Sequence, residues 1–266
     1  MTAIALTIAG SDSGGGAGIQ ADLKSFSALG AFGASVLTAI TAQNTLGVTA
    51  VEDISPGMIA AQMQAVFSDL AVNAVKVGMV SRSETIHVIA DGLAGFQGPI
   101  VVDPVMVATS GDRLLQEEAI ETLIARLLPL ATIVTPNLPE AALLTRRPLA
   151  ESREQMIAQA QAILGFGAKA VLIKGGHGKT AESIDYLVTD EVITPLAAPR
   201  IETRNDHGTG CTLAAAVTAG LARGLSLDEA CRAAKGYVHA ALEAGRNLVV
   251  GQGRGPVHHF HAWWPA

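Results

Sequence analysis

Short apolar segments alternate with longer segments of mixed character along most of the chain. The short segments are rich in Val, Ile and Ala and are bounded by Gly, Pro or polar residues, a pattern typical of buried strands. It predicts strands over residues 3–9, 34–40, 74–77, 100–102, 131–134 and 170–173. The longer segments place apolar residues three and four positions apart, which predicts helices over residues 19–29, 56–70, 83–93, 117–128 and 153–166.

This alternation predicts an α/β fold with a mostly parallel central sheet that is covered by helices on both faces. The pattern changes toward the end of the chain, where residues 183–194 predict a strand pair and residues 210–223 and 227–248 predict two helices. The sequence shows no low-complexity run, repeat or linker, so we expect one domain over residues 1–266. Open parallel sheets bind ligands beyond the carboxyl ends of their strands, and the functional site should lie there.

Composition and charge exclude several classes of protein. Hydrophobic residues make up 49% of the 266 positions, too many for a disordered chain, and the formal charge of −6 disfavours a nucleic-acid binder. The two cysteines, Cys211 and Cys231, form neither a disulfide framework nor a four-cysteine zinc site. No signal peptide is visible, and the apolar run at 211–222 is too short for a membrane span. We therefore expect a cytoplasmic protein with no membrane partner.

Two glycine-rich loops are candidate ligand sites. The first, GSDSGGGAG at residues 10–18, lacks the Lys-Ser/Thr of a P-loop, and no carboxylate follows where a dinucleotide fingerprint needs one. The second reads Asp206-His207-Gly208-Thr209-Gly210-Cys211 and opens a helix of small residues. Backbone N–H groups at a helix N-terminus point outward with partial positive charge, so the second loop predicts an anion site.

Two reactive side chains accompany this anion site. Cys211 lies in the first turn of the helix, where we expect its thiol pKa to fall below the free value of about 8.5. Lys174 ends the strand at 170–173 and enters a further glycine loop, which makes its ammonium group a candidate phosphate ligand. Cys231 lies in the middle of a predicted helix and is interpreted as a packing residue.

Carboxylates at two strand ends predict a metal–phosphate site. Asp103 follows the strand at 100–102, and Asn137 and Glu140 follow the strand at 131–134. Magnesium bound to phosphates takes one or two protein carboxylates and keeps several waters. Asn137 and Glu140 also have the spacing of a helix capping box, with Pro139 in the first turn, and both interpretations can hold together.

A further strand end predicts a pocket for a flat heterocycle. Gln43 carries a side-chain amide, which offers a donor beside an acceptor and suits the edge of an aminopyrimidine or a pyridine ring. Met79 ends another strand and is placed to flank such a ring.

Ordered motifs along nearly the whole chain are similar to those of the hydroxymethylpyrimidine/phosphomethylpyrimidine kinases of thiamine biosynthesis, in the ribokinase superfamily. The motifs lie at residues 5–13, 16–24, 41–45, 103–106, 135–137, 174–177, 207–212 and 255–260. The resemblance implies a ribokinase-like three-layer α/β/α sandwich and a kinase that uses ATP with Mg²⁺. It also implies a homodimer, which is common in the family.

The resemblance assigns roles to individual residues. Gln43 would bind the pyrimidine, in a pocket lined by Gly10, Asp22, Met79 and Val105. Cys211 takes the position of the catalytic base, within an anion hole that runs from Gly208 to Cys211 and includes Gly210. Lys174, Asn137 and Thr209 would contact ATP, and Asp103 and Glu140 would lie near Mg²⁺. Thr109, Asp206 and Val77 depart from the usual pattern, at what we expect to be the edge of the cleft.

The implied reaction is phosphorylation of 4-amino-5-hydroxymethyl-2-methylpyrimidine, followed by phosphorylation of its monophosphate to the pyrophosphate. Two alternatives remain open from the sequence. One is pyridoxal kinase activity, alone or in addition, because pyridoxal also carries a hydroxymethyl group on a flat nitrogen heterocycle. The other is a non-catalytic sensor that retains the pyrimidine pocket, against which the retained Lys174, Asp103 and Cys211 argue.

Overall fold

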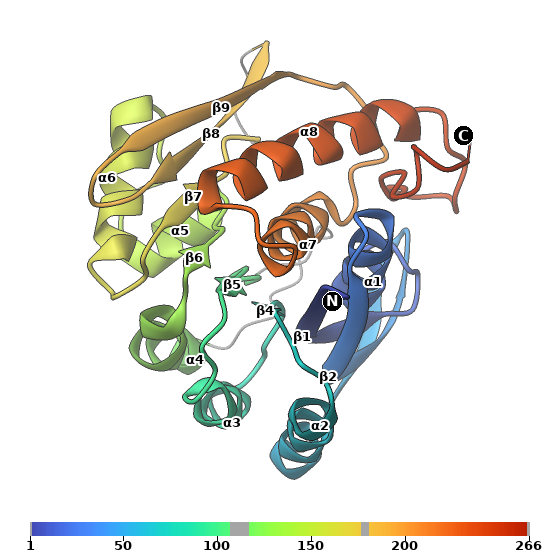
Figure 1. The fold of residues 1–266 in the computed structure, drawn as a ribbon. Helices are drawn as coiled ribbons and strands as arrows, with labels where there is room; N and C mark the ends of the chain where they lie inside the picture. The colour runs from blue at the N-terminus through green and yellow to red at the C-terminus, as the bar shows by residue number, and fades with distance from the viewer. Residues whose placement is uncertain (1, 107–116, 177–180, 265–266) are drawn as a thin grey trace.

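The computed structural model describes residues 2–106, 117–176 and 181–264, which form three layers (Figure 1). A nine-stranded sheet lies in the middle, and helices pack on both of its faces. Separate clusters of buried apolar side chains fill the spaces between the sheet and the two helical layers. This architecture confirms the predicted α/β class and the three-layer sandwich.

The sheet is parallel in its centre and antiparallel at its edges. β1 (Ile4–Asp12) pairs in parallel with β2 (Phe32–Asn44) on one side and with β4 (Ala74–Val77) on the other. The parallel pairing continues through β5 (Ile100–Val102), β6 (Ile133–Val134) and β7 (Val171–Ile173). The antiparallel strands are β3 (Gly47–Asp53) at one edge, and β8 (Glu182–Val188) and β9 (Ile193–Pro199) at the other.

One face of the sheet carries α1 (Gly18–Ala28), α7 (Thr209–Ala222) and α8 (Leu227–Gly245). α7 contacts β1, β4 and β5 and also packs against α1 and α8. Its small residues are buried almost all round, which lets the helix lie close to the sheet. This close packing places the first turn of α7 at the carboxyl ends of the central strands.

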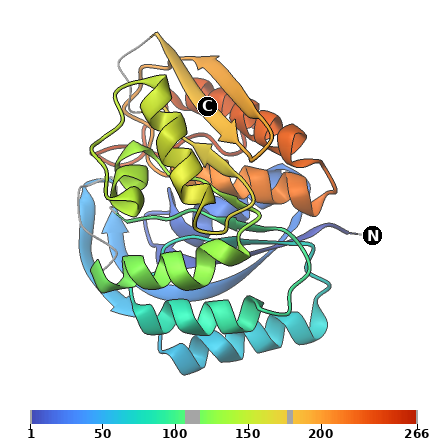
Figure 2. The ribbon, with the colours of Figure 1, turned by 90° about the vertical axis from the view of Figure 1, so that its left-hand side faces the viewer.

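The opposite face carries α2 (Pro56–Asp69), α3 (Ser83–Leu93), α4 (Glu117–Thr122), α5 (Leu138–Thr145) and α6 (Arg153–Leu164). Figure 2 shows α2, α3 and α4 side by side in one layer. Ser152 and Gln155 form a capping box at the start of α6, and Asn137 and Glu140 form the one predicted at the start of α5. No helix in the described ranges is long and apolar enough to cross a membrane.

Two segments differ from the sequence-based expectation. β3 was not predicted, because most of its residues are exposed and it therefore lacks the apolar pattern of a buried strand. The helix predicted over 117–128 is instead three short pieces: α4, a π-helical turn at Leu123–Leu127 and a 3₁₀ turn at Leu128–Leu130. Pro129 lies in the 3₁₀ turn and lacks an N–H donor, so the longer helical hydrogen bonding cannot continue past it.

The order of the strands determines where a ligand can bind. The chain runs from β1 to β2 on one side and returns to β4 on the other side of β1. Such a change of direction leaves a crevice beyond the carboxyl ends of the two strands that flank it. Here that crevice lies beyond the ends of β1 and β4, beside the first turn of α7.

Candidate active site

A cleft of about 740 Å³ lies at the carboxyl ends of the parallel strands. All but one of the binding and catalytic residues predicted from the sequence line this cleft, and the exception is Asp22. Those that line it are Gly10, Gln43, Met79, Asp103, Val105, Asn137, Glu140, Lys174, Gly208, Thr209, Gly210 and Cys211. The structure therefore brings the predicted heterocycle pocket and the predicted phosphate site into one continuous space.

Lys174 and two carboxylates form the charged part of the cleft. The Lys174 Nζ lies 2.9 Å from Asp103 Oδ1 and 3.8 Å from Glu140 Oε2. Burial alone would lower the pKa of Lys174, but the Asp103 and Glu140 carboxylates raise it above its usual range. The Lys174 ammonium therefore remains positively charged at neutral pH, as a phosphate ligand must be.

Asp103 and Glu140 respond differently to the same surroundings. Burial would raise the pKa of Asp103, but Lys174, Lys76 and a hydrogen bond from Thr135 Oγ1 hold it below its usual range. The pKa of Glu140 is raised to about 7 by burial and by the nearby Asp103 carboxylate, although Lys174 opposes this rise. Glu140 also accepts a 2.7 Å hydrogen bond from the Asn137 backbone in the capping box of α5.

These residues fit a magnesium ion. Asp103 and Glu140 place two carboxylates close enough for each to influence the other's ionisation, and a divalent cation would offset their repulsion. The described part of the chain has no cluster of three or more His, Cys, Asp or Glu residues arranged as metal ligands. Two carboxylates suffice for Mg²⁺ when nucleotide phosphates and waters complete its coordination.

The loop before α7 depends on glycine. Gly208 has φ +78°, and a side chain there would place its Cβ 1.8 Å from the Gly16 carbonyl oxygen. A Cβ on Gly210 would lie 3.3 Å from the Lys174 Nζ. The Thr209 hydroxyl donates to the Asp206 carbonyl at 2.6 Å and holds the loop closed. The backbone at the start of α7 thus approaches both Lys174 and the first glycine loop.

Cys211 lies in the first turn of α7 as predicted, but the prediction for its ionisation was wrong. The thiol pKa is raised to about 11 and not lowered. Burial is the largest cause, and the Asp22 and Asp103 carboxylates add to it, while the Lys76 ammonium opposes them. The loss of solvent around the sulfur outweighs the groups that favour the thiolate, so Cys211 is a neutral thiol at pH 7.

Asp22 does not line the cleft, which corrects its predicted role. Its carboxylate is fully buried beneath the cleft, where both oxygens accept from Lys76 Nζ at 2.8 Å. Lys76 adjoins the cleft in place of Asp22. Lys76 was not among the predicted site residues, although a lysine within the apolar strand Ala74–Val77 indicates a buried charge that needs a partner.

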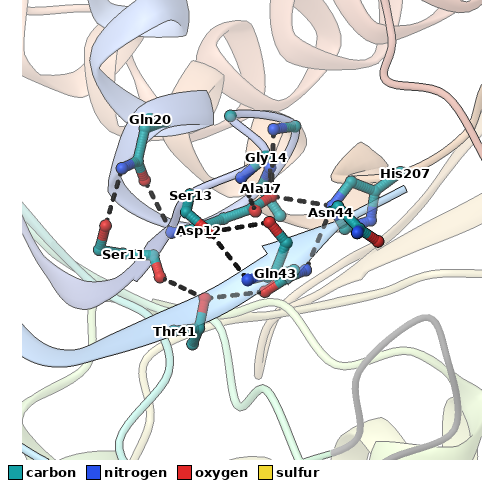
Figure 3. A network of polar contacts seen from close by, with 12 residues as sticks. Ser11, Asp12, Ser13, Gly14, Ala17, Gln20, Thr41, Gln43, Asn44 and His207 are labelled. Carbon is teal, nitrogen blue, oxygen red and sulfur yellow. Dashed lines mark hydrogen bonds and ion pairs between the residues drawn. The ribbon is translucent and has the colours of Figure 1, made fainter. Parts of the chain in front are cut away.

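A second network at the cleft was also missed. Asp12 ends β1 and accepts from His207 Nε2 at 2.9 Å, and the amide of Gln43 lies 3.4 Å from the same nitrogen (Figure 3). Burial would raise the pKa of Asp12, but hydrogen bonds from His207 and from the Ala17 and Gly14 backbone lower it. In the sequence, this network was indicated by Asp12, an acidic residue inside the first glycine-rich loop.

The three departures from the family pattern have different surroundings. Asp206 lies at the cleft as expected and forms an ion pair with Arg254, with Arg254 Nε 2.8 Å from its Oδ1. Val77 was expected at the cleft edge but is buried in the apolar core, which corrects that prediction. Thr109 lies outside the described residues.

The sequence and the fold are similar to those of known proteins. The family described as phosphomethylpyrimidine kinase matches residues 12–258. A hydroxymethylpyrimidine/phosphomethylpyrimidine kinase of Rhizobium meliloti is 66% identical over 99% of both chains. Among solved structures, a Bacillus subtilis pyridoxal kinase in complex with ADP has a TM-score of 0.90 at 38% identity and covers 97% of this chain and 98% of its own. A phosphomethylpyrimidine kinase from Clostridium difficile has a TM-score of 0.79 at 47% identity, with 90% of this chain and 98% of its own covered.

These similarities extend over nearly the whole chain and include the strand ends and loops that form the cleft. They confirm the resemblance found in the sequence and the ribokinase-like fold. The chain belongs to the hydroxymethylpyrimidine/phosphomethylpyrimidine kinase family.

Proposed function

We propose that the protein transfers the γ-phosphoryl group of MgATP to 4-amino-5-hydroxymethyl-2-methylpyrimidine and then to the resulting monophosphate, in thiamine biosynthesis. The observation that carries this proposal is the single cleft shared by Gln43, Cys211 and Lys174. Gln43 offers an amide to the heterocycle, while Lys174 and the start of α7 offer positive charge to phosphate. The high identity to kinases of this name supports the same reaction here.

Positioning and charge stabilisation dominate phosphoryl transfer, because its transition state is loose. Lys174 and the backbone of Gly208, Thr209 and Gly210 would hold the transferred group, with Asn137 at the nucleotide side of the cleft. Asp103 and Glu140 would hold Mg²⁺ directly or through water. The ion, when bound, would neutralise charge on the phosphates.

Cys211 would accept the proton of the substrate hydroxyl in the first transfer. Its resting thiol is neutral, so the reactive thiolate is a minor species at pH 7 and increases with pH. The acceptor in the second transfer is a phosphate oxygen that is already ionised, and that step needs no base. One cleft thus serves two transfers that make different demands on Cys211.

Pyridoxal kinase activity is a second candidate function. The observation that favours it is the TM-score of 0.90 to the Bacillus subtilis pyridoxal kinase. An assay of ADP release with MgATP, run separately with the pyrimidine alcohol and with pyridoxal, tests both proposals. Phosphorylated pyrimidine as the main product supports the first proposal, whereas pyridoxal phosphate as the sole product would replace it with the second.

We also propose that the protein is a homodimer. The β2–β3 hairpin exposes Ile40, Leu46 and Val51, and a second copy could cover these side chains. Light scattering of the intact protein tests this assembly. A mass of one chain across micromolar concentrations would contradict it.

A further inference from the structure

The backbone around Lys174 is fixed by contacts with the segments on either side of it. The Lys174 N–H donates to the Pro136 carbonyl at 2.9 Å, just beyond the end of β6. On the β8 side, a Cβ on Gly175 would lie 2.0 Å from the Ile184 carbonyl oxygen, so the chain can pass this close to β8 only with glycine at this position. The position of Lys174 therefore depends on how β8 holds Gly175.

Asp185 is the side chain of β8 that holds Gly175. Its Oδ1 accepts from the Gly175 N–H at 2.9 Å, and its Oδ2 accepts from the Lys235 Nζ at 2.7 Å. Both side chains lie at the cleft but are largely buried, with 5% of Asp185 and 14% of Lys235 exposed. The Lys235 ammonium also donates to Ser183 Oγ at 3.2 Å. Asp185 thus joins the segment after Lys174 to α8.

The two neighbours of Asp185 require an acceptor at each of its polar atoms. The Gly175 N–H and the Lys235 ammonium are both donors, and an ionised carboxylate has two acceptor oxygens. An asparagine has one oxygen and one NH₂ group, so it would place a donor against one of these two donors. In a site this buried, the mismatch would push Gly175 or Lys235 away from its present position.

α8 is the anchor at the other end of this link. The helix begins with a capping box formed by Ser226 and Glu229, and it packs along α7 (Figure 1). The first turn of α7 carries the candidate anion hole, where a Cβ on Gly210 would lie 3.3 Å from the Lys174 Nζ. The link through Asp185 therefore ties Lys174 to the helical layer that carries the other half of the phosphate site.

We propose that Asp185 and Lys235 act as positioning residues that hold Lys174 in register with the anion hole of α7. This inference rests on the proposed function and adds two residues that act through Lys174. Phosphoryl transfer depends on the placement of charge around the moving group, and a displacement of about 1 Å can slow an enzyme about 100-fold. Loss of the link should therefore impair ATP use in both transfers. The pyrimidine pocket at Gln43 lies at the other end of the parallel strands, on β2, and should be unaffected.

The test compares Asp185→Ala, Asp185→Asn and the double variant Asp185→Asn, Lys235→Gln. Asp185→Ala removes both contacts, whereas Asp185→Asn keeps the shape of the side chain and mismatches one of them. Lys235→Gln supplies an oxygen that can accept from the new NH₂ group, so the double variant regains both contacts without the charges. Arg232→Met is the matched control, because Arg232 forms an exposed ion pair with Asp228 on the same helix and does not line the cleft.

Steady-state kinetics give kcat and the KM for ATP, and calorimetry gives the affinities for the pyrimidine and for a non-hydrolysable ATP analogue. Asp185→Ala should lower kcat by about 10–100-fold and weaken the binding of the analogue, with the affinity for the pyrimidine unchanged. Asp185→Asn should show a similar loss, the double variant should recover most of it, and Arg232→Met should match the wild type. Thermal melting shows whether each variant retains its fold.

A double-mutant cycle with Lys174→Ala shows whether Asp185 acts through Lys174. The loss in kcat caused by Asp185→Ala should largely disappear in the Lys174→Ala background, because no ammonium is left to position. Additive losses, or an unchanged kcat and ATP affinity in folded Asp185→Ala, would overturn the inference. If the wild type transfers phosphate to neither acceptor, the proposed function fails, and the same cycle measured on binding of the ATP analogue still decides whether the pair positions Lys174.

Discussion

Lys76 and Asp22 form an ion pair with no exposure to solvent, in which the Lys76 Nζ lies 2.8 Å from both carboxylate oxygens. Burial would lower the pKa of Lys76, but the Asp22 carboxylate, with smaller effects from Cys211 and Asp103, raises it above its usual range. Thr7 also donates to Asp22 at 2.6 Å. The Lys76 ammonium therefore remains charged beneath the cleft, where it acts to lower the pKa of the Cys211 thiol while Asp22 acts to raise it.

Breaking this ion pair should destabilise the fold. Lys76→Met leaves the Asp22 charge buried without a partner, which should lower the free energy of unfolding by about 3–5 kcal/mol. The double variant Lys76→Met, Asp22→Asn contains no unpaired charge and should recover more than half of that loss. Urea denaturation of both variants measures the difference. A loss below about 1 kcal/mol in Lys76→Met would contradict a tight buried pair.

The raised pKa of Cys211 predicts slow modification by iodoacetamide at neutral pH. Only the thiolate reacts, so the rate should rise about tenfold per pH unit between pH 7 and 9.5 and show no plateau, because the pKa is about 11. Cys211→Ala provides the control, since it retains only the fully buried Cys231. A plateau below pH 8 would mean that the helix N-terminus dominates over burial after all.

The two phosphoryl transfers should depend on Cys211 to different extents. Cys211→Ala should slow the first transfer by roughly 10²–10⁴-fold, the usual range for a general base, and the second transfer much less. In the wild type, the first rate should also rise with pH above neutrality as thiolate forms. Single-turnover experiments that start from the alcohol or from the monophosphate separate the steps. Equal losses in both steps would remove Cys211 from the role of base.

Two glycines with positive φ offer a matched test of the loop before α7. Gly208 and Gly224 have φ of +78° and +87°, but only at Gly208 would a Cβ meet another backbone atom, the Gly16 carbonyl oxygen at 1.8 Å. Gly224→Ala should cost about 1–2 kcal/mol from backbone strain alone. Gly208→Ala should cost more and should also weaken ATP binding, because the loop must move away from Gly16. Similar effects on unfolding and ATP binding would show that the close approach is unimportant.

The sequence predicted the central strands well because they are short, apolar and bounded by polar residues. β4 and β5 begin and end where predicted, and the capping box of Asn137 and Glu140 is present. Strand ends therefore located most of the cleft, since they meet along one edge of a parallel sheet. The exposed strand β3 lacks such a pattern and could not be found in this way.

The missed features depend on contacts between distant parts of the chain. Asp22 was placed in the pocket by resemblance, but its burial follows from a partner 54 positions away, Lys76. Asp12 and His207 are 195 positions apart and meet only when α7 packs beside β1. The pKa of Cys211 likewise reflects the packing around its sulfur, which local sequence does not describe.

The central claim is that one cleft carries out two successive phosphoryl transfers. The most direct test is a time course with excess MgATP and a limiting amount of the pyrimidine alcohol, in which mass spectrometry separates the alcohol, its monophosphate and its pyrophosphate. The account predicts that the monophosphate rises and then falls while the pyrophosphate accumulates. Complete conversion to a monophosphate that is never phosphorylated again would contradict it.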